Sequence, residues 1–176
     1  MPALYDAHIH LADAALLSHW EDIQACYQTI GLANAVVVGT CPRDWPAVLK
    51  LAKQDHRIIP AVGLHPWKVN HAPTDWQSQF LDALDSGTPA IGEIGLDKWI
   101  PAHDLERQQA AFRFQLAEAA KRDLPVSIHC LKAIGPMMET LRTIELPQRG
   151  FHLHAFNGPI ELIQELVSLG LSLIHI

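Results

Sequence analysis

Residues 90–97 read AIGEIGLD and residues 124–129 read LPVSIH, and a helical pattern lies between them. Each quoted stretch contains a short apolar run typical of a buried strand. Asp104 stands where it can cap the intervening helix. The inner face of that helix is predicted to consist of Leu105, Phe112, Leu116 and Ala119. A strand, a helix and a second strand in this order predict two parallel strands joined by a right-handed crossover.

The same alternation extends over the rest of the chain and predicts seven strands separated by six helices. The strands are expected at residues 3–9, 35–39, 58–64, 90–96, 125–129, 151–154 and 171–176. The first helix is expected over residues 16–30, and Asp44 is expected to cap the second. The sixth helix is expected to turn Ile160, Ile163 and Val167 inward. Strict alternation predicts a parallel α/β fold, either a barrel or a doubly wound open sheet.

Composition and charge exclude several classes of protein. The 176 residues are 49% hydrophobic and 18% charged, which is typical of a globular domain and not of a disordered or collagen-like chain. The net charge of −6 argues against broad binding of duplex DNA by phosphate neutralisation. The amino-terminal residues lack the pattern of a secretory signal, and no apolar run reaches about 18 residues. Three cysteines without CxxC spacing suggest reduced thiols, so we expect a cytoplasmic protein and no membrane partner.

Histidine is abundant, with 11 residues, and several histidines follow predicted strands. In parallel α/β folds the chemistry is carried at the carboxyl ends of the strands. The candidate ligands on or after these strands are His8, His10, His65, Glu93, His129 and His154. Nitrogen and oxygen ligands without thiolate suit Mg²⁺, Mn²⁺ or Zn²⁺.

His8 and His10 are two residues apart on one predicted strand, so their imidazoles face the same side and can share one ion. They could instead be core or surface histidines, but two buried imidazoles without partners would be costly. Glu93 is a carboxylate within an apolar strand and therefore needs a cation or several donors. A position bridging two ions would satisfy it, and a structural salt bridge is the alternative.

His129 and His154 could complete a second ion site with Glu93, although either histidine alone would more often belong to the core. His152 shares a strand face with His154, and the residues alone do not separate the two. His65 is a candidate substrate contact, with a structural role in its loop as the alternative.

Three lysines and two tryptophans follow predicted strands and could contact a nucleic acid. Lys68, Lys98 and Lys132 are candidate phosphate contacts, although a single lysine is more often a solvated surface residue. Trp67 and Trp99 could stack on a base, with simple loop packing as the alternative.

Five ordered motifs give the chain a resemblance to a known family. They are Asp6-x-His8-x-His10, Gly63-Leu64-His65-Pro66, Gly92-Glu93-Ile94-Gly95-Leu96-Asp97, Leu124-Pro125-Val126-x-Ile128-His129 and His154-Ala155-Phe156-Asn157-Gly158. In this order they resemble the TatD-like metal-dependent deoxyribonucleases, which are amidohydrolase-like barrels. The resemblance implies one domain over residues 1–176 with an incomplete TIM-type (β/α) barrel of about seven strands. The last strand and the last two helices of such a barrel would be missing.

The resemblance also implies a site and an activity. His8 and His10 would hold one divalent ion, Glu93 would bridge two, and His129 and His154 would hold the second. The reaction would be hydrolysis of DNA phosphodiesters from the 3′ to the 5′ end by a two-metal mechanism.

The chain departs from the family pattern at three places. Lys98 replaces an aromatic residue, Leu131 stands where an arginine is common, and the strand with a water-orienting aspartate is absent. We therefore expect a nuclease-like protein whose 176-residue form is impaired or inactive. An amidohydrolase, an aminoacyl-tRNA deacylase and a non-catalytic metal-binding fragment are the alternatives.

Overall fold

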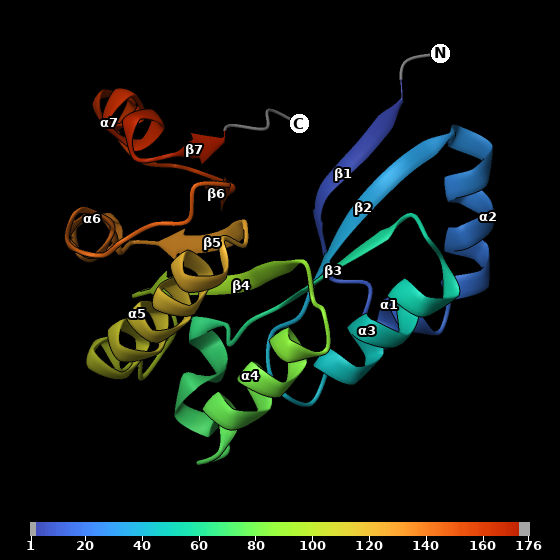
Figure 1. Ribbon diagram of the computed structural model, residues 1–176, viewed down its shortest axis with the longest axis horizontal. Helices are drawn as coiled ribbons and strands as arrows, with labels where there is room; N and C mark the ends of the chain where they lie inside the picture. Colours follow the sequence, from blue (N-terminus) through green and yellow to red (C-terminus); the bar gives the residue numbers. More distant parts are fainter. Residues whose placement is uncertain (1–2, 173–176) are drawn as a thin grey trace.

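Seven strands alternate with helices in the computed structural model, which describes residues 3–172 (Figure 1). The strands are β1 (Leu4–Ile9), β2 (Leu32–Val38), β3 (Ile58–Val62), β4 (Ala90–Asp97), β5 (Val126–Leu131), β6 (Phe151–His154) and β7 (Leu171–Ser172). All seven predicted strands are therefore present. The part of the last one predicted at residues 173–176 lies outside the described residues.

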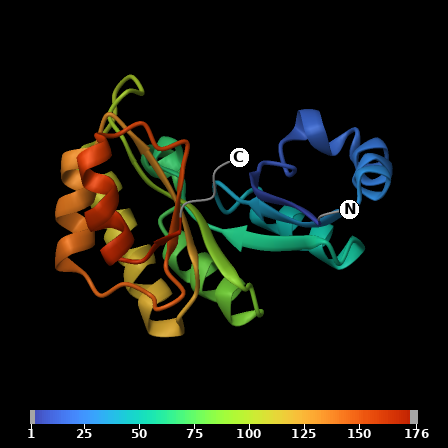
Figure 2. The same cartoon turned by 90° about the horizontal axis from the view of Figure 1, so that it is seen from above.

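The order of the strands decides between the two predicted architectures. The sheet runs β1-β2-β3-β4-β5-β6-β7, and every neighbouring pair is parallel. A doubly wound sheet reverses its strand order at a switch point, and this sheet does not. The strands curl as they succeed one another, with helices on the outer side of the curve (Figures 1 and 2). The fold is an incomplete α/β barrel, as expected.

The helices fill the connections between the strands. They are α1 (Ala14–Leu17), α2 (Trp20–Ile30), α3 (Trp45–Gln54), η1 (Pro66–His71), α4 (Trp76–Asp85), α5 (Leu105–Arg122), α6 (Ile134–Thr143), η2 (Ile160–Leu162) and α7 (Ile163–Ser168), where η marks a 3₁₀ helix. Within residues 3–172, every helix is too short or too polar to cross a bilayer.

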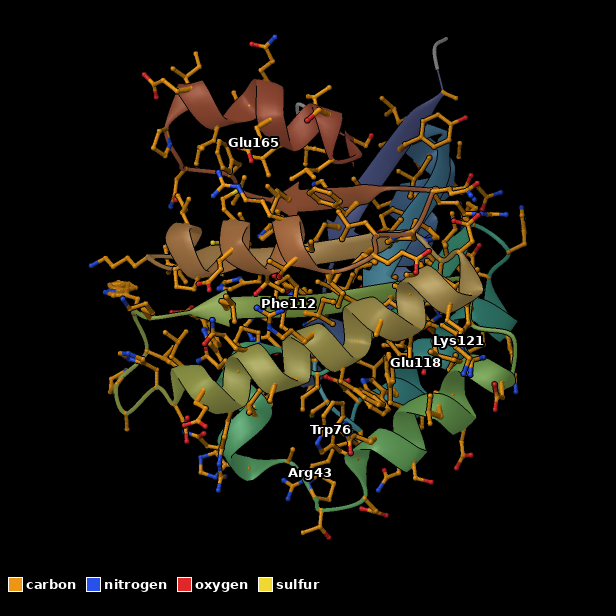
Figure 3. The ribbon with its side chains drawn as sticks, turned by 60° about the vertical axis from the view of Figure 1, so that its left-hand side comes forward. Arg43, Trp76, Phe112, Glu118, Lys121 and Glu165 are labelled. Atoms are coloured by element: carbon orange, nitrogen blue, oxygen red, sulfur yellow. The ribbon has the colours of Figure 1, made fainter. Side chains whose placement is uncertain are left out.

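Helix α5 packs on the sheet as its sequence pattern predicts. Phe112, Leu116 and Ala119 are completely buried, and Phe112 lies on the side of α5 that faces β4 (Figure 3). Asp104 caps the helix, because its carboxylate accepts the backbone N–H of Arg107 at 3.0 Å.

Two buried glutamines on α5 hold the ends of two neighbouring strands. Gln108 bonds both backbone groups of Asp97, at the end of β4, each at 2.9 Å. Gln115 accepts the N–H of Leu64, just after β3, at 2.6 Å and donates to its carbonyl at 3.3 Å. These side-chain amides satisfy backbone groups that the sheet leaves unpaired at its carboxyl edge.

Three expectations about the helices were wrong. The predicted helix over residues 16–30 is divided into α1 and α2, because Asp13 caps a separate short turn at Ala15. Asp44 stands at the start of α3 but does not cap it, since its carboxylate turns back to the N–H groups of Thr40 and Cys41.

The third error concerns the face of the last helix. Ile160 and Val167 are exposed, because the 3₁₀ turn at its start changes the phase of the helix. Leu162, Leu166 and Leu169 face the core instead.

Candidate metal centre

Glu93 lies in the middle of β4 and is 1% exposed. Its backbone N–H donates to the carbonyl of Gly39 at 2.8 Å, which ties β4 to the end of β2. Within residues 3–172, all ion pairs of its carboxylate are with histidines, and no lysine or arginine forms one. A buried carboxylate surrounded by imidazoles is a set of groups that binds a cation.

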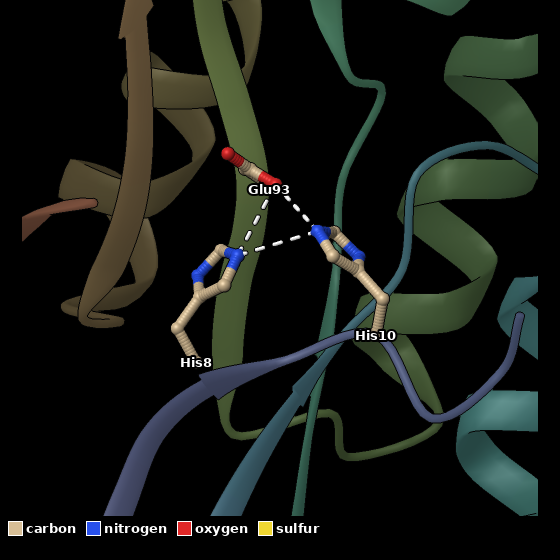
Figure 4. A group of neighbouring side chains, drawn as sticks. All are labelled: His8, His10 and Glu93. Atoms are coloured by element: carbon tan, nitrogen blue, oxygen red, sulfur yellow. Dashed lines mark hydrogen bonds and ion pairs between the residues drawn. The ribbon is translucent and has the colours of Figure 1, made fainter. Parts of the chain in front are cut away.

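One oxygen of Glu93 faces the two histidines of β1 and the turn after it (Figure 4). Oε2 lies 3.3 Å from Nε2 of His8 and 3.1 Å from Nε2 of His10, and these two nitrogens are 3.4 Å apart. Ligand atoms around an ion at about 2.0–2.1 Å are separated by roughly 3.0–3.4 Å in octahedral or tetrahedral geometry. The three atoms therefore fit a divalent cation without rearrangement.

The other oxygen of Glu93 faces a second pair of histidines. Oε1 lies 3.1 Å from Nδ1 of His129, on β5, and 3.7 Å from Nε2 of His65. These three residues also bring ligand atoms within 4.8 Å of one another. Glu93 is thus shared by two separate groups, one at each oxygen.

The hydrogen bonds of His65 and His129 determine which of their nitrogens can bind an ion. Nδ1 of His65 accepts the N–H of Trp67 at 3.2 Å, so a neutral ring carries its proton on Nε2, toward Glu93. Nε2 of His129 lies 2.9 Å from Oδ2 of Asp97, so Nδ1, which faces Glu93 at 3.1 Å, is the nitrogen that can bind an ion once it has lost its proton. His129 can therefore act as a ligand, and His65 acts as a hydrogen-bond donor.

Ser127 orients His8 in a similar way. Its hydroxyl lies 3.0 Å from Nδ1 of His8, which leaves Nε2 of that ring for the cation. The same hydroxyl lies 3.5 Å from Nδ1 of His152. The His8 side chain is only 2% exposed, so its ring depends on protein groups such as this hydroxyl for hydrogen bonds.

The charges of the centre are strongly coupled. Burial would raise the pKa of Glu93, but hydrogen bonds from His10, His129, His65 and His8 hold it far below its ordinary value. The hydrogen bond to Glu93 raises the pKa of His10. Burial opposes protonation of His129, yet Glu93 and Asp97 together raise its pKa. The carboxylate of Glu93 is therefore ionised, and the raised pKa values of His10 and His129 favour protons at the positions where a cation would bind.

His154 and His152 diverge, although both lie on β6. His154 stacks on His8 with ring centroids 3.9 Å apart and an interplanar angle of 13°, and it borders the cavity described next. Burial, followed by the charge of His8, lowers the pKa of His154 to about 4, so its ring is neutral at pH 7. His152 lies deeper, beside Ser127. In this structure His154 is near the centre but outside the two groups that surround Glu93.

A cavity of about 340 Å³ opens above the centre. It is lined by His10, Ala12, Asp13, Val38, Thr40, Asp44, His65, Trp67, Lys68, Glu93, His129 and His154. Of the three lysines predicted as phosphate contacts, Lys68 lies in this wall. Lys98 and Lys132 are exposed outside it, and Lys132 lies over the ring of Trp99.

The structure adds functional residues that the sequence reasoning did not assign. Asp97 is completely buried and holds both His129 and Trp67. Hydrogen bonds from these two groups outweigh burial and lower its pKa. Asp44 fixes Thr40, whose carbonyl accepts the N–H of His65 at 2.8 Å. Asp97 had a signal in the sequence, because it lies four residues from Glu93 on the same strand face.

Metal binding to this centre is expected to release protons. The raised pKa values of His10 and His129 strengthen the competition between protons and a cation at these nitrogens, so the affinity for metal should fall as the pH is lowered. Titration calorimetry with Mn²⁺ at pH 7, in two buffers of different ionisation enthalpy, measures this release. His10→Ala should reduce the number of protons released, and His19→Ala, at an exposed position, should not. A heat that is equal in both buffers would contradict the expectation.

The chain matches a family of known proteins over almost its whole length. The family described as TatD related DNase matches residues 5–173. The 3′-5′ ssDNA/RNA exonuclease TatD of Escherichia coli K12 is 30% identical over 173 residues, covering 96% of this chain and 65% of the relative. The uncharacterized metal-dependent hydrolase YjjV of the same organism is 31% identical over 143 residues, covering 80% of this chain and 55% of the relative.

Solved structures show the same fold. The crystal structure of YjjV superposes with a TM-score of 0.88 at 28% identity and covers 96% of this chain and 66% of its own. A TatD family hydrolase from Entamoeba histolytica gives a TM-score of 0.81 at 21% identity over 96% of this chain and 63% of its own. This chain thus spans between 55% and 65% of the length of the two curated relatives named above.

Proposed function

Since the chain belongs to the TatD related DNase family, we propose that it is a divalent-metal-dependent hydrolase that cleaves phosphodiester bonds of DNA from the 3′ end. The observation that carries the proposal is the buried Glu93, whose two oxygens face separate groups of histidines. A carboxylate shared by two groups of histidines is an arrangement that can hold the two metal ions of a two-metal hydrolase. The name of the E. coli relative supports a single-stranded nucleic acid as substrate.

His8, His10 and Oε2 of Glu93 would hold one ion, and His129 with Oε1 of Glu93 would hold the other. His154, with its lowered pKa, is a neutral imidazole beside them and is available as a further ligand. When bound, such ions make water more acidic and offset negative charge on the phosphate. Mg²⁺, Mn²⁺ and Zn²⁺ all accept this set of nitrogen and oxygen ligands.

The protein's own residues would prepare the centre for this chemistry. Ser127 and Asp97 fix the rings of His8 and His129, so that Nε2 of His8 and Nδ1 of His129 face Glu93. His65 borders the cavity, and its single ring N–H, which lies toward Glu93, would turn to a phosphate oxygen of a bound substrate. Lys68 borders the same cavity and adds a positive charge for an anionic substrate. Lys98 and Lys132 would contact phosphates farther along the strand.

A panel of substrates tests the proposed function. The purified chain, supplied with Mg²⁺, Mn²⁺ or Zn²⁺ in turn, is incubated with a single-stranded DNA oligonucleotide, an aminoacyl-tRNA and small amides. We expect stepwise shortening of the 5′-labelled oligonucleotide from its 3′ end, and no shortening with EDTA. Turnover of the amides or of the aminoacyl-tRNA alone would replace the proposal with an amidohydrolase or a deacylase. Bound metal without any turnover would indicate a metal-binding protein.

A further inference from the structure

Two exposed tryptophans are tied to Asp97, the buried carboxylate that holds His129. Trp67 is 52% exposed and borders the cavity, and Trp99, after β4, is 60% exposed. Indole rings are usually well buried, because they carry a large apolar surface. The metal centre itself uses neither ring as a ligand.

Trp67 is held in a fixed orientation. Its Nε1–H donates to Oδ2 of the buried Asp97 at 2.6 Å. Its ring also meets those of His65 and His129 edge to face, with centroids 5.0 and 6.1 Å away. The polar edge of the indole is therefore occupied, while about half of the side chain remains open to solvent. A rigid aromatic surface loses little conformational entropy when a ligand stacks on it.

Trp99 is anchored to the same carboxylate. Its backbone N–H donates to Oδ1 of Asp97 at 2.6 Å. The ammonium of Lys132 lies 5.3 Å from the centre of its ring, which is a cation–π distance. Asp97 thus anchors the indole of Trp67 at the cavity wall and also the backbone of Trp99, whose ring lies against the ammonium of Lys132.

We propose that Trp67, with Trp99 and Lys132, forms a subsite for unpaired nucleobases. The base next to the bond that is cleaved would stack on Trp67, whose ring contacts two histidines of the centre. Trp99 would receive a neighbouring base, and Lys132 would bind a phosphate of the same strand. The subsite rests on the proposed function and extends it, because it explains how the enzyme would select single strands.

The chemistry of the subsite favours one class of ligand. Every base has an aromatic face, so stacking accepts any sequence, and both DNA and RNA can supply it. In a duplex these faces are covered by neighbouring base pairs. A single strand is therefore expected to bind better than the same strand within a duplex. An acidic protein can bind such a strand because the charge contact is local to Lys68 and Lys132.

Equilibrium binding tests the subsite apart from catalysis. Fluorescein-labelled hexathymidylate, with a methylphosphonate at its 3′-terminal linkage to resist hydrolysis, is titrated with the Mg²⁺-supplied chain and followed by anisotropy. The other ligands are oligouridylate, an abasic strand of equal length and a duplex. We expect Trp67→Ala to weaken binding of the thymidylate about tenfold or more. Trp67→Phe, which keeps an aromatic face, should lose less.

Ile160→Ala is the matched control, because it removes an exposed apolar side chain that does not line the cavity. Circular dichroism of each variant verifies that it is folded. Lys132→Gln should reduce the slope of log K against log salt by about 0.7, the value for one phosphate on a single strand. Lys50→Gln, at an exposed position on α3, should leave the slope unchanged.

The outcomes separate the subsite from the proposed function. Equal affinity of Trp67→Ala and the unaltered chain, or equal affinity for abasic and thymidylate strands, would overturn the subsite even if hydrolysis is observed. Base-dependent binding that is lost in Trp67→Ala would support it even if no substrate is cleaved. If oligouridylate binds with the same affinity as the thymidylate, the subsite accepts both RNA and DNA. If oligouridylate binds much more weakly, the subsite is restricted to DNA.

Discussion

Replacing Glu93 with glutamine is expected to abolish metal binding and to lower hydrolysis by about 10³-fold. Glutamine keeps the size of the side chain but loses the charge to which His8, His10 and His129 point. A metal ion contributes several kcal/mol of charge stabilisation in the transition state, and each 1.36 kcal/mol is a tenfold change in rate. Because both oxygens of Glu93 take part, the loss should affect both ion sites together.

The measurement combines metal content with the rate of oligonucleotide shortening. Glu139→Gln is the matched control, since it changes the same residue type at an exposed position on α6. His10→Ala provides a second comparison, because it removes a ligand from one group and should leave one ion bound instead of two. A Glu93→Gln protein that keeps its metal and a rate within tenfold of the unaltered chain would refute the assignment of the centre.

Gly95→Ala is expected to prevent stable folding. Gly95 has a φ of +143°, which L side chains rarely adopt, and an added Cβ would lie 1.9 Å from the carbonyl oxygen of His129. That carbonyl belongs to the neighbouring strand, where Gly95 pairs with His129. Relief of the overlap would require β4 and β5 to separate, and this overlap together with the strained φ costs about 4 kcal/mol. The loss is a large part of the stability of an ordinary domain.

Urea unfolding followed by circular dichroism measures this effect. Gly135→Ala, in α6, is the control, because an added Cβ would meet nothing within 4 Å. Alanine is the better helix former, so this variant should be more stable by about 0.5–1 kcal/mol. A Gly95→Ala protein that unfolds at the same urea concentration as the unaltered chain would show that the two strands can separate freely.

The fold could be predicted because its local signals agree with one another. Buried parallel strands are apolar runs, and the helices between them repeat their apolar residues every three or four positions. The prediction for Asp44 failed because this residue has two sets of partners within reach. Asp44 stands at a helix start, yet its carboxylate bonds Thr40 and Cys41 in the preceding loop. Both sets of partners are close to Asp44 in the sequence, so the local pattern is compatible with either.

The site shows the same division. Strand geometry alone places His8 beside His10, and the same rule applied once more would have indicated Ser127 beside His129 and Asp97 beside Glu93. It could not have indicated which ring nitrogen is free in His65 and His129. Those tautomers depend on the N–H of Trp67, in η1, and the carboxylate of Asp97, at the end of β4.

The two buried glutamines of α5 have a mechanical consequence. Gln108 is hydrogen-bonded to the end of β4, and Gln115 to the start of the loop after β3. The two glutamines lie about two helical turns apart on the same helix. If the helix slides against the sheet, it carries the anchor of His129 and the segment leading to His65 in the same direction. The distance between His65 and His129, beside Oε1 of Glu93, is therefore little changed by such sliding. The bonds of Gln108 and Gln115 do not reach His8 or His10. Thermal fluctuations of the helix against the sheet should therefore change the distances from Oε2 of Glu93 to His8 and His10 first.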